Sequence, residues 1–161
     1  MRLFLAMPFA DEFKPVYEAI RDVALDLGIN PIRVDELYEP GPIIEQIVKE
    51  IGNCDFVVAE VSSRNANVYY EVGLAHCVRK PTMLIASKDC VANLPFDIRH
   101  NRVVVLPLTR PDRAPPEGAE ASEINIRCMR AVRDGFKHPI TARQREPPWL
   151  QRRIDFPIVR W

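Results

Sequence analysis

Short apolar runs alternate with amphipathic segments along the first two-thirds of the chain, and this alternation constrains the fold more than any other feature. The clearest run is "CDFVVAEV" (54–61), which is apolar at its centre, as expected of a parallel strand covered on both faces. Similar runs occupy residues 2–7, 30–35, 81–87 and 102–108. Strands and helices that alternate through short connections imply right-handed crossovers and a parallel sheet.

The segments between these runs have the period of amphipathic helices. Apolar residues recur at helical spacing over 11–27, and Gly28 is suited to end that helix. A second helix is expected from Pro42 to Gly52, and a third within "SSRNANVYYEVGLAHCVRK" (62–80). The pattern predicts an α/β fold, flavodoxin-like or Rossmann-like. We expect a doubly wound sheet of about five mainly parallel strands with helices on both faces.

A length of 161 residues is typical of one globular domain. We assign the α/β domain to residues 1–109 and a flexible, Pro-rich loop to 110–122. The remainder, 123–161, is predicted to form a C-terminal helix and a tail that pack on the same domain.

The charge balance and the cysteines exclude several classes of function. Basic and acidic residues number 22 each, so no net field draws the chain toward nucleic acid or a membrane. The four cysteines form no C-x-x-C pair, which argues against a zinc site and a disulfide framework. The first apolar run is too short for a signal-peptide core, and no run approaches the ~20 apolar residues of a spanning helix. A cytoplasmic location without membrane or specific nucleic-acid partners is therefore expected.

The sequence lacks the signatures of several common enzyme families. The first strand leads into "MPFADEF" rather than G-x-G-x-x-G, and neither a P-loop nor a G-x-S-x-G elbow occurs. The three histidines show no metal-ligand spacing. Ordinary dinucleotide-dependent dehydrogenase, P-loop NTPase and serine-hydrolase chemistry are therefore disfavoured, and no cofactor is expected.

A binding site is expected at the carboxyl edge of the sheet, because ligands of open parallel sheets bind where strands lead into helices. Residues that could form such a site follow four of the predicted strands. They are Met7, Pro8, Phe9 and Asp11; Asp35; Glu60, Ser62, Ser63, Arg64, Asn65 and Asn67; and Ser87 and Lys88.

Glu71 is the candidate catalytic residue in this set. It follows the Asn-rich loop and is expected in the first turn of the third helix, where the helix dipole favours an ionised carboxylate. A fixed carboxylate suits reactions that pass through a cationic sugar. A glutamate at this place also commonly serves only to complement the dipole or complete a capping box. If Asn67 is the N-cap, the box position is Tyr70 and Glu71 lies one residue beyond it.

Several segments together resemble one known superfamily. They are "MPFADEFKPVYEAI", "IRVDE", "CDFVVAEVSSRNANVYYEVGLAHCVRKPTMLIAS" and "LPFDIRHNRVV". Across about residues 3–106 the chain resembles the nucleoside 2-deoxyribosyltransferase-like superfamily, which shares its fold with TIR-like NAD-cleaving domains. "NANVYYEVGLA" carries the most specific part of the likeness.

The resemblance implies an enzyme that cleaves an N-glycosidic bond, with Glu71 attacking or stabilising the anomeric carbon. Met7, Pro8 and Phe9 would line the base pocket, while Asp35 and the loop from Ser62 to Asn67 would hold sugar hydroxyls or phosphate. The substrate would be a nucleoside, a nucleotide or an NAD-like molecule, with water or a second base as acceptor. The resemblance also implies a homo-oligomer.

Other interpretations remain open for several residues. Relatives commonly have an aspartate with a following threonine after the third strand, whereas this chain reads Glu60-Val61-Ser62-Ser63, so either the pocket is adapted or Glu60 is a structural acid. Asn65 and Asn67 are as well suited to ending the loop and capping the helix as to contacting substrate. Asp97, in "LPFDIR", is a turn former or a sugar contact.

Alternatives also remain for the function. Beyond Asp11, Asp35 and Glu60 no general acid is evident, which favours a leaving group that needs little protonation. The alternative to an enzyme is a non-catalytic, nucleotide-sensing TIR-like module that signals by assembly, or a structural partner-binding domain.

Overall fold

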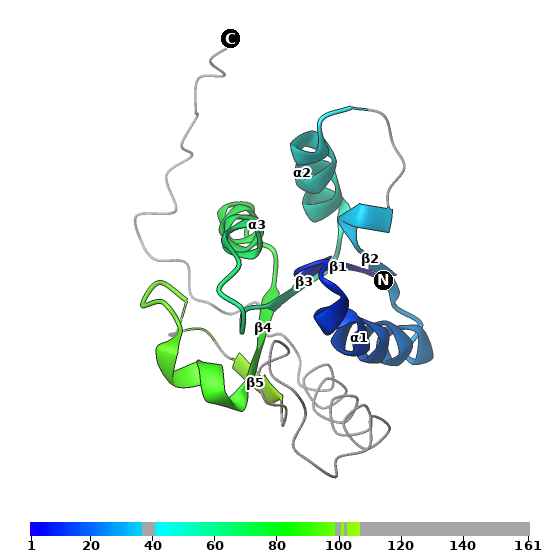
Figure 1. Ribbon diagram of the computed structural model, residues 1–161. Helices are drawn as coiled ribbons and strands as arrows, with labels where there is room; N and C mark the ends of the chain where they lie inside the picture. Colours follow the sequence, from blue (N-terminus) through cyan, green and yellow to red (C-terminus); the bar gives the residue numbers. More distant parts are fainter. Residues whose placement is uncertain (37–40, 99–100, 102, 107–161) are drawn as a thin grey trace, which may run out of the picture.

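Five parallel strands form one sheet in the order β2-β1-β3-β4-β5 (Figure 1). The computed structural model describes residues 1–36, 41–98, 101 and 103–106. The strands are β1 (Arg2–Ala6), β2 (Asn30–Ile32), β3 (Phe56–Glu60), β4 (Thr82–Ser87) and β5 (Val103–Leu106). This order is that of flavodoxin-like doubly wound folds, so the predicted fold class is confirmed.

Three α-helices of the described residues cover the sheet on both faces. They are α1 (Lys14–Asp26), α2 (Ile43–Asn53) and α3 (Ala66–Cys77). Short 3-10 turns accompany them: η1 (Asp11–Phe13), η2 (Val34–Glu36) and η3 (Lys88–Asn93). α1 lies on one face of the sheet, and α2 and α3 lie on the other (Figure 1).

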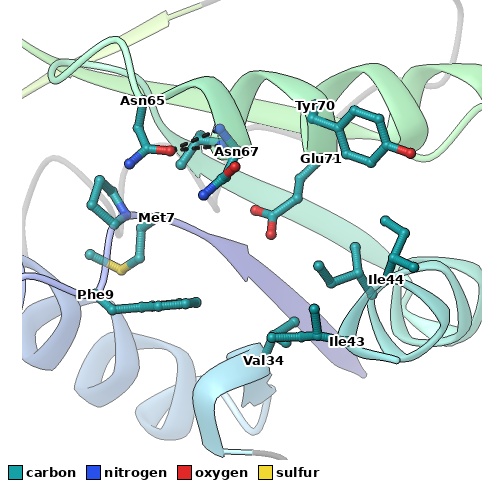
Figure 2. A pocket seen from close by; sticks show the side chains of 12 residues that line it. Met7, Phe9, Val34, Ile43, Ile44, Asn65, Asn67, Tyr70 and Glu71 are labelled. Atoms are coloured by element: carbon teal, nitrogen blue, oxygen red, sulfur yellow. Dashed lines mark hydrogen bonds between the residues drawn. The ribbon is translucent and has the colours of Figure 1, made fainter. Parts of the chain in front are cut away.

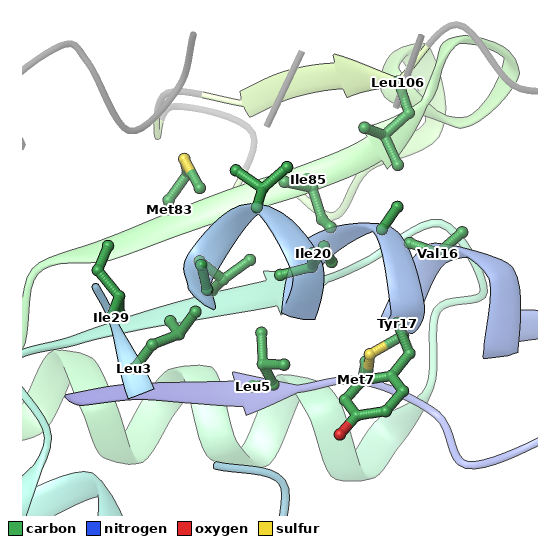
Figure 3. Packing of buried hydrophobic residues seen from close by; sticks show 14 of the residues in the cluster. Leu3, Leu5, Met7, Val16, Tyr17, Ile20, Ile29, Met83, Ile85 and Leu106 are labelled. Carbon is green, nitrogen blue, oxygen red and sulfur yellow. The ribbon is translucent and has the colours of Figure 1, made fainter. Parts of the chain in front are cut away.

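The alternation of side chains along the strands creates two separate cores. On the α1 face, Leu3 and Leu5 of β1 and Ile85 of β4 pack with Val16 and Ile20 of α1 (Figure 3). Successive side chains of a strand point to opposite faces, so the residues between these belong to the other core. Both faces of the sheet are thus apolar, which explains the nearly continuous apolar runs in the sequence.

The second core holds α3 against the sheet. Val68, Val72 and Ala75 recur at helical spacing along α3 and pack on a surface that includes Ala6 and Ala59. These two alanines are register partners on β1 and β3. Their small side chains fit a close approach of α3 to the sheet at the carboxyl ends of the central strands.

The structure differs from the sequence prediction at a few boundaries. The second strand was expected over 30–35 but ends at Ile32, because the chain turns into η2 at Val34. The third helix begins only at Ala66, after the turn that follows β3. The predicted loop at 110–122 and the C-terminal helix and tail at 123–161 lie outside the described residues. Of the helices in the described ranges, none has the length and apolar character that crossing a membrane requires.

The central strands are expected to carry most of the stability. Leu84 on β4 is fully buried in the α3-side core, whereas Leu25 on α1 is 55% exposed. We predict that Leu84→Ala lowers the free energy of unfolding by about 2–5 kcal/mol, because it leaves a cavity in a packed interior. The matched change Leu25→Ala should alter it by less than about 0.5 kcal/mol. Urea denaturation of both variants tests this, and equal losses would contradict the assignment of the core.

Candidate functional site

A cavity of about 340 Å³ opens at the carboxyl edge of the sheet, between α2 and α3. Its floor includes Met7 and Pro8, directly after the central strand β1. The helix that follows β1 covers one face of the sheet and the helix that follows β3 covers the other, which makes this edge the topological switch point. The other lining residues come from the loop after β1, from η2, α2 and α3, and from the cap position before α3. They are Phe9, Val34, Ile43, Ile44, Ile47, Asn65, Asn67, Val68, Tyr70 and Glu71.

Asn65 fixes where α3 begins. Its side-chain oxygen accepts hydrogen bonds from the backbone N–H groups of Asn67 (2.9 Å) and Val68 (3.3 Å). This is the arrangement of an N-cap residue, so of the two asparagines considered as caps it is Asn65, and not Asn67, that caps α3. Arg64, immediately before the cap, has φ of +54° and donates a hydrogen bond to the Asn93 carbonyl. The turn after β3 thereby sets the direction in which α3 leaves the sheet.

Glu71 lies in the second turn of α3, not in the first turn as the sequence suggested. It precedes Val72 and follows Val68 by three residues, so it flanks the apolar stripe of α3 on the side that faces α2. Figure 2 shows its carboxylate directed into the cavity, between the wall formed by Ile43 and Ile44 and the two asparagines. The helix geometry therefore delivers one carboxylate to the centre of the cavity.

Burial dominates the electrostatics of Glu71. The residue is 7% exposed, and among the described residues none forms a hydrogen bond or an ion pair with its carboxylate. Burial raises the pKa of this carboxyl to about 7, because desolvation penalises the charged form. The dipole was expected to favour ionisation, but its effect falls off within the first turn and Glu71 lies beyond it. Burial therefore decides the direction of the pKa shift.

One wall of the cavity is apolar, and the sequence did not identify it. Val34, Ile43, Ile44, Ile47 and Val68 line the cavity but were not predicted as site residues. Ile43 and Ile44 are 57% and 38% exposed, although they begin a helix that packs on the sheet. Two adjacent isoleucines in a first helical turn point in different directions, so one stripe does not bury both. The pair of adjacent isoleucines, more than one buried stripe accommodates, was the sequence signal for this apolar wall.

Phe9 forms the opposite wall and is supported from outside the cavity. The guanidinium of Arg33 lies 5.6 Å from the ring centre of Phe9 and 3.9 Å from that of Tyr17. Arg33 is held by Asp35 through two hydrogen bonds of 2.6 Å. Asp35, predicted to contact substrate, does not line the cavity; it orients the arginine that stacks on a lining aromatic ring.

Glu60, Ser62 and Ser63 were predicted to contact substrate but do not line the cavity. Glu60 is 1% exposed, and its Oε1 accepts a hydrogen bond from the Ser62 backbone N–H (3.0 Å). The Ser62 hydroxyl accepts one from the Ser87 N–H (2.7 Å), which links the ends of β3 and β4. Burial raises the pKa of Glu60 to about 6. This geometry favours the structural interpretation of Glu60.

Two further predicted contacts, Asp11 and Asp97, are exposed and lie outside the cavity lining. Asp11 begins η1. Asp97 lies within the turn in which the Ile98 N–H bonds the Pro95 carbonyl, in keeping with its interpretation as a turn former. The cavity therefore unites Glu71 with Met7, Pro8 and Phe9 and with Asn65 and Asn67, and it excludes the other candidate residues.

Comparison with known proteins supports the fold. No family model and no curated protein sequence match this chain. Its structure is similar to CMP N-glycosidase BcmB of Clostridium botulinum, with a TM-score of 0.53, 18% identity and coverage of 65% of this chain and 88% of that one. It is also similar to the 2-deoxyribosyltransferase of Bacillus psychrosaccharolyticus, with a TM-score of 0.45, 23% identity and coverage of 53% and 72%. The fold that the sequence resemblance implied is thus confirmed.

The unpaired carboxyl should make stability depend on pH. The folded-state pKa of Glu71 lies above its ordinary value of 4.5, so the folded state binds a proton at this carboxyl more tightly than the unfolded state does. The stabilisation of the folded state by this proton is complete below about pH 4.5 and is lost as the pH rises through about 7. Between pH 5 and pH 8, the unfolding free energy of wild type should therefore fall by about 1–3 kcal/mol more than that of Glu71→Gln, which lacks the titrating carboxyl.

The measurement is urea denaturation at both pH values. Glu18→Gln, on α1 at the opposite face of the sheet, is the matched control and should follow wild type. Parallel pH curves for wild type and Glu71→Gln would show that the carboxyl is not buried alone.

Proposed function

We propose that this protein cleaves the N-glycosidic bond of a nucleoside, a nucleotide or an NAD-like molecule, with Glu71 as the nucleophile or the stabiliser of the cationic sugar. The observation that carries the proposal is a carboxyl that is 7% exposed, lacks a partner among the described residues and points into a cavity at the switch point of the sheet. A group that is costly to bury and unpaired is a candidate functional group. The fold shared with a CMP N-glycosidase is consistent with this chemistry.

The lining divides naturally into a part for the sugar and a part for the base. Asn65 and Asn67 lie beside Glu71 and offer amide groups for sugar hydroxyls, although the Asn65 side-chain oxygen is already engaged in capping α3 (Figure 2). Phe9 and the isoleucines of α2 offer an apolar surface for a planar base. A substrate placed in this way has its anomeric carbon next to the only carboxylate of the described lining.

Ionised Glu71 would meet the positive charge that develops on the sugar as the bond to the base breaks. Burial of Glu71 would strengthen this attraction, because charges interact more strongly away from bulk water and no described residue forms a hydrogen bond or ion pair with the carboxylate. A pKa of about 7 leaves a substantial ionised fraction near neutral pH. Water or a second base would then attack the same carbon, which gives hydrolysis or transfer.

The direct test is release of free base. We expect wild type to release base from at least one member of a panel of NAD, ribonucleosides, deoxyribonucleosides and their 5′-phosphates, followed by chromatography. Glu71→Gln keeps the shape of the side chain but removes the charge, and it should lower the rate at least about a hundredfold. Glu18→Gln should retain the wild-type rate. Equal release by wild type and Glu71→Gln, or no release by either, would refute the proposal.

A second candidate function is a nucleotide-sensing module that assembles without catalysis. It is favoured by exposed apolar side chains on the helices that border the cavity: Ile43 (57%) and Tyr70 (56%), which line it, and Val48 (49%), further along α2. Such a module would change its particle size when nucleotide is added and would consume none. Light scattering on the same incubations separates the two candidates.

A further inference from the structure

We infer that Arg33 is a positioning residue that determines how strongly the cavity binds a flat ring. Arg33 does not line the cavity, but its guanidinium contacts the ring of Phe9, which does. The inference rests on the proposed function, in which Phe9 belongs to the surface for the base. It names the residue outside the lining on which recognition of the base depends.

Phe9 is a lining residue that its own surroundings leave poorly held. It lies in the loop between β1 and η1 and is 52% exposed. By contrast Phe13, four residues later, is buried in the core on the α1 face. An exposed ring that is free to change rotamer loses that freedom when a ligand stacks on it, and this loss weakens binding. A contact that fixes the ring beforehand therefore strengthens binding.

The guanidinium of Arg33 supplies such a contact, because two other residues fix the guanidinium itself. The ring centre of Tyr17, a buried residue of the α1-face core, lies 3.9 Å from it (Figure 3). Asp35 binds it through two hydrogen bonds of 2.6 Å, the bidentate geometry that suits the flat fork of arginine. The Arg33 side chain is only 14% exposed. A cation held in this way offers a fixed partner to the ring of Phe9, 5.6 Å away.

The same ion pair holds a second lining residue. Arg33 and Asp35 flank Val34, and their two hydrogen bonds bridge the chain across it at the start of η2. Val34 is buried and lines the cavity. Figure 2 shows Phe9 and Val34 on the side of the cavity away from α3. One arginine thus joins the loop after β1 to η2 in a single wall.

A second arginine beside Tyr17 provides a matched comparison. Arg21, on α1, lies 5.8 Å from the Tyr17 ring centre and pairs with Asp22. Its side chain is 43% exposed, and Asp22 offers it one carboxylate oxygen rather than two. Neither Arg21 nor Asp22 lines the cavity. Arg21 therefore has the same chemical partners as Arg33 but lies away from the wall that contains Phe9.

Loss of the Arg33 contact should weaken binding of the base and spare the chemical step. Glu71 is carried by α3, which packs on the sheet through Val68, Val72 and Ala75. Substitution of Arg33 should therefore raise KM and leave kcat nearly unchanged. A role in folding alone would lower the amount of active protein, and hence the apparent kcat, without changing the preference for ligands that carry a base.

The first test is calorimetric binding of adenosine, cytidine, guanosine and uridine 5′-monophosphates, with ribose 5-phosphate as the ligand without a base. We expect wild type to bind at least one nucleotide about tenfold or more tighter than ribose 5-phosphate. Arg33→Lys keeps the charge but loses the flat fork, so it should reduce this preference by about three- to tenfold. Asp35→Asn breaks the same ion pair from the other side and should act in the same direction.

Arg21→Lys is the control for this measurement and should retain the wild-type preference for a nucleotide. The absence of a preference in wild type would overturn the inference. So would an unchanged preference in both Arg33→Lys and Asp35→Asn.

A double-mutant cycle shows whether Arg33 acts through Phe9. In the Phe9→Leu background, Arg33→Lys should change nucleotide affinity by less than about twofold, because the ring that it positions is gone. An undiminished effect in that background would show that Arg33 acts by another route and would overturn the inference.

Release of free base separates this inference from the proposed function. Where wild type releases base, Arg33→Lys should raise KM for that substrate and keep kcat within about twofold. A fall in kcat at unchanged KM would overturn the inference and leave glycosidic cleavage standing. A preference for nucleotides that depends on Arg33, without base release from any substrate of the panel, would support the inference and refute catalysis.

Discussion

The burial of one unpaired carboxyl is the constraint around which the carboxyl edge of this fold is organised. α3 packs through Val68, Val72 and Ala75 on the small side chains at the ends of β1 and β3, and this packing holds Glu71 at the cavity. Taking a carboxylate out of water without a partner is costly, and the raised pKa expresses that cost. A fold selected only for stability would place an apolar or paired residue there, so the cost points to a ligand.

Polar residues around this edge have two different tasks. Asn65 caps α3, Glu60 and Ser62 fix the turn after β3, and Asp35 with Arg33 supports the ring of Phe9. These residues shape the cavity from outside or from its border. Glu71 alone among the described carboxylates enters the lining. Substitutions in the first group should therefore act through the geometry of the cavity, whereas a substitution of Glu71 changes the charge that the proposed substrate would meet.

Much of the fold was predictable because both signals involved are local. Continuous apolar runs and helical periods follow directly from a parallel sheet covered on both faces, and these identified all five strands and the three helices of the described residues. The contributions of Met7, Pro8 and Phe9 followed from the rule that ligands bind at the carboxyl edge.

The predictions failed for side chains whose positions depend on tertiary packing. The sequence did not reveal that Glu60 turns back to its own strand end, nor that Asp35 pairs with Arg33 two residues away. Glu71 was expected in the first turn, but α3 begins at Ala66 with Asn65 as its cap, so Glu71 lies in the second turn. There burial, which the sequence does not show, raises its pKa. The apolar wall from α2 was missed because both exposed and buried isoleucines fit a helical pattern.

The central claim is that Glu71 presents a buried, unpaired carboxyl to the cavity. Its most direct test is an NMR titration of the glutamate side-chain carboxyl carbons in the ligand-free protein, with Glu71→Gln used to assign the signal. The structure predicts a midpoint at about pH 7 for Glu71. A midpoint near the ordinary value of 4.5 would show that the carboxyl is solvated or paired and would contradict the account.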